Sequence, residues 1–187
     1  IPQEAAALKA GKWQAYSIGS GIRGKTLGIF GYGKIGAVVA GYGKAFGMNV
    51  VAWGRPSTLD KAAADGFAAA KSREAFFEEC DVVSLHLRLI PETRGIVPAA
   101  DLARMKPTGL LVNTSRAGLV EQGALEKALR AGRPGMAAVD VFEEEPVVGG
   151  DHPLLAMDNV FAVPHLGYVE KGSLTHMFET IFDQVVA

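Results

Sequence analysis

A glycine-rich turn near the start of the chain constrains the fold most. The segment Thr26–Gly36 reads TLGIFGYGKIG, so an apolar stretch runs directly into the pattern G-x-G-x-x-G, and helical periodicity follows at residues 34–46. A strand, this turn and a helix together form a cradle in which backbone N–H groups and the positive end of the helix dipole bind a diphosphate. In this interpretation Gly31 allows the turn, Gly33 lets the diphosphate approach the backbone, and Gly36 lets the helix pack closely on the strand.

Apolar, β-prone segments alternate with helical segments along the chain, which is the pattern of a parallel sheet covered on both faces. We therefore predict an α/β fold: a Rossmann-type doubly wound parallel sheet with flanking helices. The predicted strands are Thr26–Phe30, Asn49–Trp53, Gly66–Ala69, Val82–Leu87, Leu110–Asn113, Ala137–Val141 and Val160–Val163. The predicted helices between them are Lys34–Phe46, Leu59–Asp65, Ser72–Glu79 with Ser72 as N-cap, Ala99–Met105 and Glu121–Ala131.

The helix predicted at residues 34–46 carries large apolar side chains at helical spacing, and we expect this stripe to be buried. The stripe consists of Ile35, Val38, Val39, Tyr42 and Phe46. Gly41 and Gly43 lie on the same helix, and each costs it about 1 kcal/mol relative to alanine. We expect them to allow close approach of another helix.

Length and charge bound the class of protein. The 187 residues suffice for one sizeable core, and 19 Lys and Arg against 20 Asp and Glu leave a net charge of −1. This balance gives no electrostatic reason to bind nucleic acid or an anionic membrane, so a small-molecule partner is expected. Cys80 is the single cysteine and no apolar run has the length of a membrane span, which predicts a cytoplasmic protein. The four histidines and Cys80 lack metal-ligand spacing, and no metal site is predicted.

The end of the second predicted strand bears on the identity of the cofactor. Dinucleotide folds usually carry an Asp or Glu about 20 residues past the glycines, where it binds the adenosine 2′-hydroxyl. Gly54 stands 18 residues after Gly36 here, and Arg55 follows it. An arginine can pair with a 2′-phosphate that a carboxylate would repel. NAD and NADP therefore both remain open as cofactors, and Arg55 favours NADP.

Three further segments place charged groups directly after predicted strands. Leu110–Val120 contains Arg116, Val139–Pro146 contains a run of three glutamates, and Val160–Gly167 contains a histidine. Open parallel sheets bind ligands at this end of their strands. Together with the glycine turn, these segments resemble the D-isomer-specific 2-hydroxyacid dehydrogenases, a family that includes phosphoglycerate, glycerate, D-lactate and formate dehydrogenases. The resemblance covers nearly the whole chain.

The resemblance implies a role for three side chains. Arg116 would bind the carboxylate of a 2-oxo acid, and a guanidinium can do so through two parallel hydrogen bonds. His165 would donate a proton to the oxygen as hydride reaches the keto carbon. Glu145 would pair with His165, and an ionised carboxylate there favours the protonated ring. The chain would thus interconvert a D-2-hydroxy acid and its 2-oxo acid with a nicotinamide cofactor.

The resemblance also implies a set of cofactor-binding residues. Asp140 matches the position that accepts a hydrogen bond from the nicotinamide carboxamide, whereas Arg88 replaces a proline that is common in the family and leaves the adenine contact open. The predicted cofactor-binding residues are Gly31, Tyr32, Gly33, Lys34, Ile35, Gly36, Trp53, Gly54, Arg55, His86, Leu87, Arg88, Thr93, Thr114, Ser115, Arg116, Asp140, His165, Gly167 and Tyr168.

Enzymes of this family have two domains, with the substrate in the cleft between them, and they dimerise through the cofactor domain. By this resemblance we predict the end of an incoming hinge helix and a linker at residues 1–22, an NAD(P)-binding domain at 23–168, and the start of a return helix toward a substrate domain at 169–187. A homodimer is expected, as is weak turnover by this chain alone.

Two alternatives compete with a dehydrogenase. The corepressors that resemble this family bind dinucleotide mainly to control assembly, and they keep the residues that correspond to Arg116, Glu145 and His165. A methyltransferase can also carry a similar glycine turn, but it would not need the arginine and histidine segments.

Overall fold

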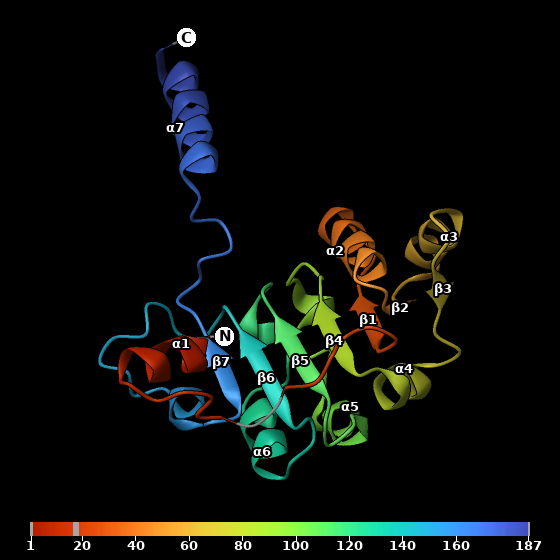
Figure 1. Ribbon diagram of the computed structural model, residues 1–187. Helices are drawn as coiled ribbons and strands as arrows, with labels where there is room; N and C mark the ends of the chain where they lie inside the picture. Colours follow the sequence, from red (N-terminus) through yellow and green to blue (C-terminus); the bar gives the residue numbers. More distant parts are fainter. Residues whose placement is uncertain (1, 17–18, 187) are drawn as a thin grey trace.

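The chain folds around one sheet of seven parallel strands (Figure 1). The computed structural model describes residues 2–16 and 19–186. Residue 1, residues 17–18 of the predicted linker and residue 187 at the end of the predicted last helix lie outside these ranges. The strand order is β3-β2-β1-β4-β5-β6-β7, so the progress of the chain across the sheet reverses between β1 and β4. This order confirms the predicted doubly wound Rossmann-type architecture.

The strands are β1 (Thr26–Phe30), β2 (Asn49–Trp53), β3 (Ala68–Ala69), β4 (Val82–Leu85), β5 (Leu110–Asn113), β6 (Met136–Val139) and β7 (Val160–Ala162). Neighbouring strands end together: β4 stops at Leu85 because β1, its partner, stops at Phe30. The strands predicted at 82–87 and 137–141 are therefore too long at their ends, since they continue past the last paired residues, Leu85 and Val139. As a result, the loops after the strands start from one common edge of the sheet.

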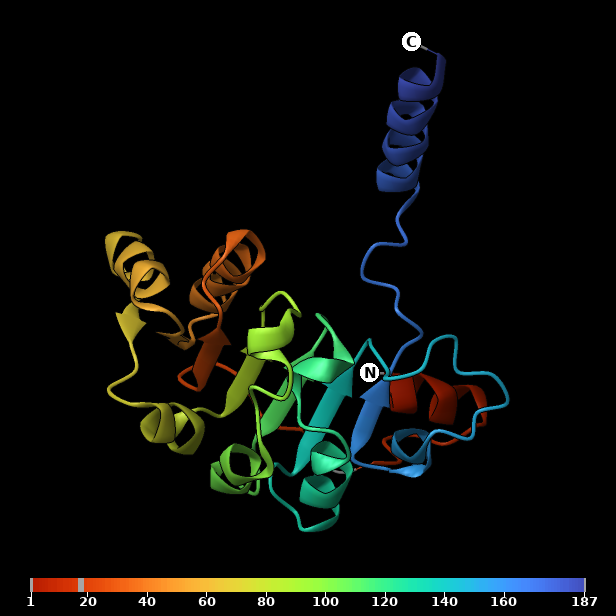
Figure 2. The same ribbon diagram turned by 180° about the vertical axis from the view of Figure 1, so that it is seen from behind.

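Helices cover both faces of this sheet. They are α1 (Pro2–Lys9), α2 (Lys34–Ala45), α3 (Pro56–Ala64), α4 (Arg73–Glu79), α5 (Ala99–Arg104), α6 (Ala124–Arg130) and α7 (Lys171–Val186), with short 3-10 turns at Pro91–Thr93, Ala117–Leu119 and Pro153–Ala156. Figure 1 and Figure 2 show α2 and α3 on one face of the sheet and α4, α5 and α6 on the other. The predicted cap of α4 is confirmed, because Ser72 Oγ accepts the Ala75 N–H at 3.1 Å.

Two helices begin at residues other than those predicted. α3 begins at Pro56 instead of Leu59, because proline suits the first position of a helix, where its missing N–H is not needed. α6 begins at Ala124, three residues later than predicted, because Gly123 has a left-handed backbone with φ +71°, through which a right-handed helix cannot continue.

The main core lies between the sheet and helices α4 to α6. Phe30 of β1 meets Phe76 and Phe77 of α4 edge to face, with ring centroids 5.3–6.2 Å apart among the three. Gly28 leaves room for this cluster, because a Cβ there would lie 2.7 Å from the ring of Phe76. Cys80 is completely buried beside it. A smaller apolar cluster lies under α2 and α3 on the other face.

The predicted burial of the apolar stripe on α2 is wrong. Four of its five residues are exposed, including Ile35 at 70% and Phe46 at 63%. The face of α2 that packs on the sheet carries small residues instead, namely Gly36, Ala40 and Gly43. The sheet beneath is itself apolar, so close approach of the helix backbone, rather than large side chains on the helix, fills the interface.

The predicted helix contact at the two α2 glycines is also wrong. A Cβ at Gly43 would lie 2.6 Å from Leu27 Cδ2 and 3.1 Å from Val50 Cγ2, both on the sheet. A Cβ at Gly41 would have no neighbour within 4 Å. Close packing therefore requires only one of the two glycines, and its partner is the sheet.

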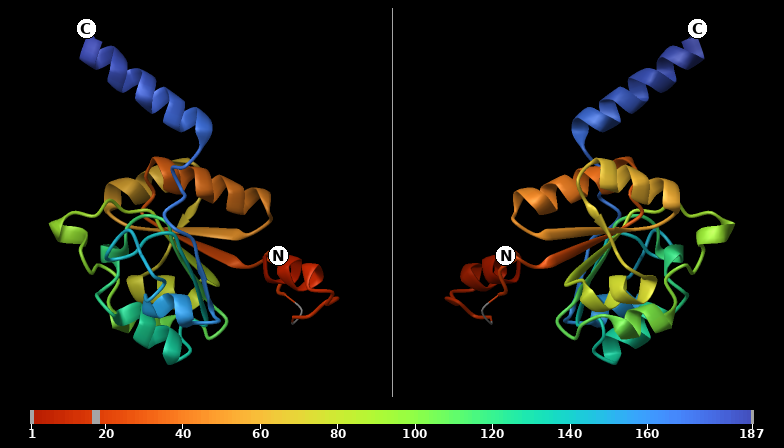
Figure 3. Two further views of the ribbon diagram at one scale, coloured as in Figure 1. Left: turned by 90° about the vertical axis from the view of Figure 1, so that its left-hand side faces the viewer. Right: turned by 90° about the vertical axis from the view of Figure 1, so that its right-hand side faces the viewer.

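The two end segments extend away from the body of the domain. Figure 3 shows the segment around α1 on one side and α7 projecting on the other. None of the described residues of α7 is buried. The rings of Phe178 and Phe182 stack on its surface with centroids 6.3 Å apart. Among the described residues, no helix combines the length and the apolar character that crossing a bilayer requires.

The contrast between the glycines predicts opposite effects of one substitution. Gly41→Ala should raise the free energy of unfolding by up to about 1 kcal/mol, because alanine costs less backbone entropy in an open helical position. Gly43→Ala should lower it by about 1–3 kcal/mol, because its methyl group overpacks the contact with Leu27. Urea denaturation of both variants measures the difference, and equal effects would contradict the described packing of α2.

Candidate functional site

The glycine turn joins β1 to α2 at the edge where the strands end. Gly31 has φ +97°, and a Cβ there would lie 2.7 Å from the backbone oxygen of His86. A Cβ at Gly36 would collide with the backbone oxygen of Gly31 and lie 3.1 Å from Ile29 Cγ2. These contacts confirm the predicted turn at Gly31 and the close helix packing at Gly36. Space is open around Gly33, which is the N-cap of α2.

The N-terminus of α2 is left free for an anion. Its cap residue has no side chain, and the first turn carries no acidic residue. The first N–H groups of a helix have no partner within the helix, and the helix dipole adds partial positive charge at the same point. The turn therefore fits a diphosphate, as the glycine pattern predicts.

A cavity of about 630 Å³ opens beside this turn. It is lined by residues that follow β1, β2, β4 and β5. The lining residues are Gly31, Tyr32, Gly33, Lys34, Ile35, Gly54, Arg55, Thr58, His86, Leu87, Arg88, Leu89, Thr114, Ser115 and Arg116. Most of the predicted cofactor-binding residues thus surround one space of the size that small-molecule sites have.

The Lys and Arg side chains that line this cavity face no acidic side chain in its lining. Lys34, Arg55, Arg88 and Arg116 line it, and its lining includes no carboxylate. None of the ion pairs found in the described part of the chain involves these four residues. A second cavity of about 550 Å³, beside α6, shows the opposite pattern, with five carboxylates and no Lys or Arg in its lining. Although the chain is nearly neutral overall, these four cations make the cavity suited to an anionic ligand.

Two predicted cofactor-binding aromatic residues turn their side chains away from the cavity. The Tyr32 side chain is buried, and its hydroxyl donates a hydrogen bond to Asp65 Oδ2 at 2.9 Å. Burial and this carboxylate raise the Tyr32 pKa to about 12. Trp53 packs against the main core and does not line the cavity. Tyr32 can therefore contribute its backbone to a ligand, whereas Trp53 serves packing.

The loop after β4 is fixed by its own hydrogen bonds. Thr93 Oγ1 donates to Arg88 O at 2.7 Å and accepts the Ile90 N–H at 2.9 Å. Thr93 itself does not line the cavity, so it shapes the loop that carries Arg88. His86 Nε2 lies 2.9 Å from Ser84 Oγ, and burial lowers the His86 pKa to about 4. His86 is therefore neutral at pH 7.

The loop after β5 presents Arg116. Ser115 Oγ donates to Leu85 O at 2.7 Å, and Asn113 Oδ1 accepts the Ser115 N–H at 3.1 Å. Asn113 Nδ2 also donates to Arg116 O at 2.9 Å. The backbone that carries Arg116 is thus held from both sides. Its guanidinium donates to Ser115 O at 2.6 Å and lines the cavity.

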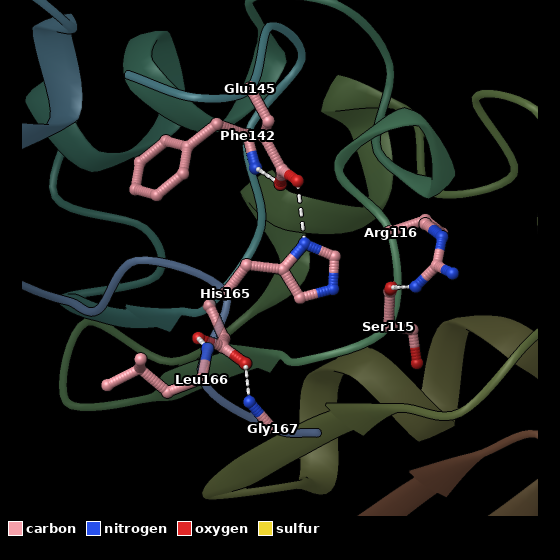
Figure 4. Close-up of polar contacts among 8 residues, drawn as sticks. Ser115, Arg116, Phe142, Glu145, His165, Leu166 and Gly167 are labelled. Carbon is pink, nitrogen blue, oxygen red and sulfur yellow. Dashed lines mark hydrogen bonds and ion pairs between the residues drawn. The ribbon is translucent and has the colours of Figure 1, made fainter. Parts of the chain in front are cut away.

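Glu145, which follows β6, and His165, which follows β7, lie within ion-pair distance of each other. His165 Nδ1 lies 2.6 Å from Glu145 Oε2, and Glu145 Oε1 accepts the Phe142 N–H at 2.8 Å. Figure 4 shows the carboxylate directed at the imidazole ring, with Arg116 on the adjacent segment. The ring of Tyr168 meets the His165 ring edge to face at 5.4 Å. The second ring nitrogen, Nε2, has no protein partner among the described contacts.

The carboxylate of Glu145 is ionised at neutral pH. Partial burial alone would raise its pKa, but the hydrogen bonds from His165 and Phe142 and the charge of Arg116 outweigh burial and lower the pKa below the usual glutamate value. Arg116 lies on the segment beside this pair, as Figure 4 shows, and its charge contributes to the lowered pKa.

Asp140 has a role that sequence reasoning did not predict. Its buried carboxylate accepts the N–H groups of Leu166 at 2.6 Å and Gly167 at 2.8 Å, so it holds the backbone that follows the histidine. Thr58 and Leu89 also line the cavity without having been predicted. Pro56 at the first helical position could have placed Thr58 in the first turn of α3, beside Arg55.

The order of the strands and the cradle at their common edge define an α/β domain of the dinucleotide-binding class. Residues 1–167 match the family model described as D-isomer specific 2-hydroxyacid dehydrogenase, NAD binding domain. The chain belongs to this family.

Individual relatives agree with this assignment. The chain is 41% identical over 180 residues to a glyoxylate reductase of Aeropyrum pernix and 40% identical over 168 residues to a D-3-phosphoglycerate dehydrogenase of Methanocaldococcus jannaschii. These matches cover 96% and 89% of this chain but 53% and 32% of the two relatives. A crystal structure of a putative D-3-phosphoglycerate dehydrogenase from Ralstonia solanacearum matches with a TM-score of 0.95 and 54% identity, over all of this chain and 58% of that one.

The comparisons also bear on the alternatives. The family match argues against a methyltransferase. The relatives are named as reductases and dehydrogenases, so the comparisons do not favour a corepressor-like sensor. The chain spans about half or less of the length of these curated relatives.

The partly buried His86 predicts a pH dependence of stability. Its pKa is about 4 in the folded chain against an ordinary 6.5, so the unfolded chain binds more protons between these values. Stability should therefore fall as the pH drops from about 6.5 to about 4, by up to about 3 kcal/mol. His86→Gln should remove most of this slope in urea denaturation, and His176→Gln, on the exposed face of α7, should leave it unchanged. An unchanged slope in His86→Gln would contradict the burial of the ring.

Proposed function

We propose that the chain is the NAD(P)-binding half of a dehydrogenase that interconverts a D-2-hydroxy acid and its 2-oxo acid. One observation supports this most: Glu145 and His165 pair beyond the ends of β6 and β7, and Arg116 on the adjacent segment lines the cavity beside the glycine turn. The nicotinamide cofactor, when bound, supplies or accepts the hydride.

The residues divide the remaining chemistry among them. Arg116 binds the substrate carboxylate through two parallel hydrogen bonds and so fixes the orientation of the keto carbon. His165 donates a proton from Nε2 to the substrate oxygen during reduction, and it takes the proton back during oxidation. Glu145, ionised and bonded to Nδ1, holds the ring so that Nε2 faces the substrate.

The relatives are longer than this chain, and we propose that a second domain completes the substrate site. Residues 1–22 and 169–187 are the connections to it, which fits the helices α1 and α7 at the two ends. The second domain supplies the rest of the substrate pocket and excludes water on closure. The chain alone then binds dinucleotide but turns over weakly.

Substitutions in the complete protein test these roles. Arg116→Lys keeps the charge but loses the planar fork, and kcat/KM for 2-oxo acids should fall about 100-fold. His165→Gln should lower kcat by about 100-fold or more. Reduction should require the protonated ring and oxidation the neutral ring, so the two directions should have opposite pH profiles. His176→Gln is the matched control, and identical pH profiles in both directions would contradict the role of His165.

We further propose that the cofactor is NADP in preference to NAD. The diphosphate binds at the glycine turn and Lys34, and the substrate carboxylate binds to Arg116. Two further cations of the same cavity, Arg55 and Arg88, then have no ligand group assigned to them. A 2′-phosphate adds about −1.5 to −2 charges at neutral pH, which matches the two remaining cations. Arg55 follows β2 and Arg88 follows β4, so they flank the adenosine end of the cavity from two sides of β1.

Fluorescence titration of the chain with NADPH and NADH tests this proposal. NADPH should bind more tightly, and Arg55→Ala and Arg88→Ala should each weaken NADPH by about tenfold while changing NADH by less than about twofold. Arg130→Ala on the exposed face of α6 should change neither. A preference for NADH that survives both substitutions would contradict the proposal.

We also propose that the protein forms a homodimer. The exposed apolar side chains of α2 and of α7 support it, because single domains rarely leave such faces in water. A monomeric mass of the complete protein at micromolar concentration would contradict the dimer.

A further inference from the structure

Asp140 directly follows β6, and its carboxylate accepts two backbone hydrogen bonds within the chain itself. The residue is 3% exposed. Oδ1 accepts the Leu166 N–H at 2.6 Å, and Oδ2 accepts the Gly167 N–H at 2.8 Å. These are charge-assisted hydrogen bonds in a site shielded from water, which makes them stronger than hydrogen bonds between neutral groups.

The two amides belong to the residues directly after His165, and His165 has an unusual backbone. Its φ is +52°, a left-handed backbone conformation that residues other than glycine rarely adopt. Its N–H bonds to Val163 O at 3.1 Å across Pro164, so the chain reverses sharply there. A strained conformation persists only where the surroundings hold it. The carboxylate of Asp140 restrains the chain on the far side of this turn.

The imidazole ring of His165 is held by the same segment that holds its backbone. Glu145 lies five residues after Asp140, and its carboxylate bonds to Nδ1 of the ring at 2.6 Å. The Phe142 N–H, between the two acids, fixes Glu145 at 2.8 Å. Residues 140–145 thus hold His165 at two points, the main chain through Asp140 and the ring through Glu145.

We infer that Asp140 is a positioning residue, which sets the place of the His165 ring by clamping the amides of Leu166 and Gly167. This inference rests on the proposed function, in which His165 donates the proton. A carboxylate has about four acceptor positions, so the clamp leaves room for the predicted contact with the nicotinamide carboxamide. The two roles are separable, because the clamp exists without cofactor and the carboxamide contact does not.

The first test uses the cofactor-free chain and needs no activity. Asp140→Asn has nearly the same shape, but it turns an –NH₂ group toward one of the two amides. Hydrogen exchange at the Leu166 and Gly167 amides should become at least about tenfold faster, and the NMR signal of the proton between His165 Nδ1 and Glu145 should weaken or shift. Asp158→Asn, an exposed aspartate before β7, should change neither signal.

A second variant disturbs the clamp and keeps the charge. A Cβ at Gly167 would lie 3.0 Å from Asp140 Oδ2, so Gly167→Ala presses on the carboxylate. It should shift the same NMR signals in the same direction by a smaller amount. Unchanged exchange and an unchanged His165 signal in both variants would overturn the clamp, whether or not the protein is a dehydrogenase.

The second test measures the complete protein. Asp140→Asn should lower kcat at saturating cofactor by about 10–100-fold, because a displaced proton donor reacts slowly, whatever the loss of the predicted carboxamide contact does to the cofactor Kd. A weaker Kd with kcat unchanged at saturating cofactor would overturn the positioning role and leave Asp140 as a cofactor contact. If the unsubstituted protein reduces no 2-oxo acid, the proposed function fails, and the NMR experiment alone then decides on the clamp.

Discussion

The close approach of α2 to β1 is the constraint on which the rest of the structure depends. Gly31 turns the chain with a backbone that only glycine adopts freely, and Gly36 lets the helix start against the oxygen of Gly31. A side chain at either position would collide with backbone atoms, which cannot move aside as a flexible side chain can. The result is a helix N-terminus without a capping side chain, at the mouth of a cavity that is lined by cations.

The common edge of the sheet turns this local feature into a site. Parallel strands that end together place their following loops side by side, so Arg55, Arg88 and Arg116 surround one space although they lie far apart in sequence. The same edge continues to β6 and β7, where Glu145 and His165 meet. The two cavities differ in the charge of their lining, since cations line the one beside the glycine turn and carboxylates line the one beside α6.

Much of the fold and of the site could be predicted because both depend on local patterns. The β1 strand, the glycine turn and the start of α2 follow from one segment of eleven residues, and β1, β2 and β5 have the predicted bounds. The three catalytic candidates each follow a strand, so the rule that parallel sheets bind ligands at the carboxyl ends of their strands is enough to place them together. The strand ends at 86–87 and 140–141 were not predictable, because pairing with a neighbour decides them.

Three features depend on tertiary packing and could not be read from the sequence. The large side chains of α2 face outward because Ala40 and Gly43 let its backbone lie close to the sheet. Tyr32 points into the small core toward Asp65, although the glycine pattern surrounds it. The engagement of Asp140 with the amides after His165 joins residues 26 positions apart, and no periodicity marks such a contact.

The most direct measurement of the central claim is a crystal structure of the chain with saturating NADPH. The diphosphate should lie against the backbone N–H groups of Lys34 and Ile35, with the nicotinamide end of the cofactor beside Arg116 and His165. Electron density for the cofactor elsewhere, or a diphosphate bound away from the N-terminus of α2, would contradict the site described for this fold.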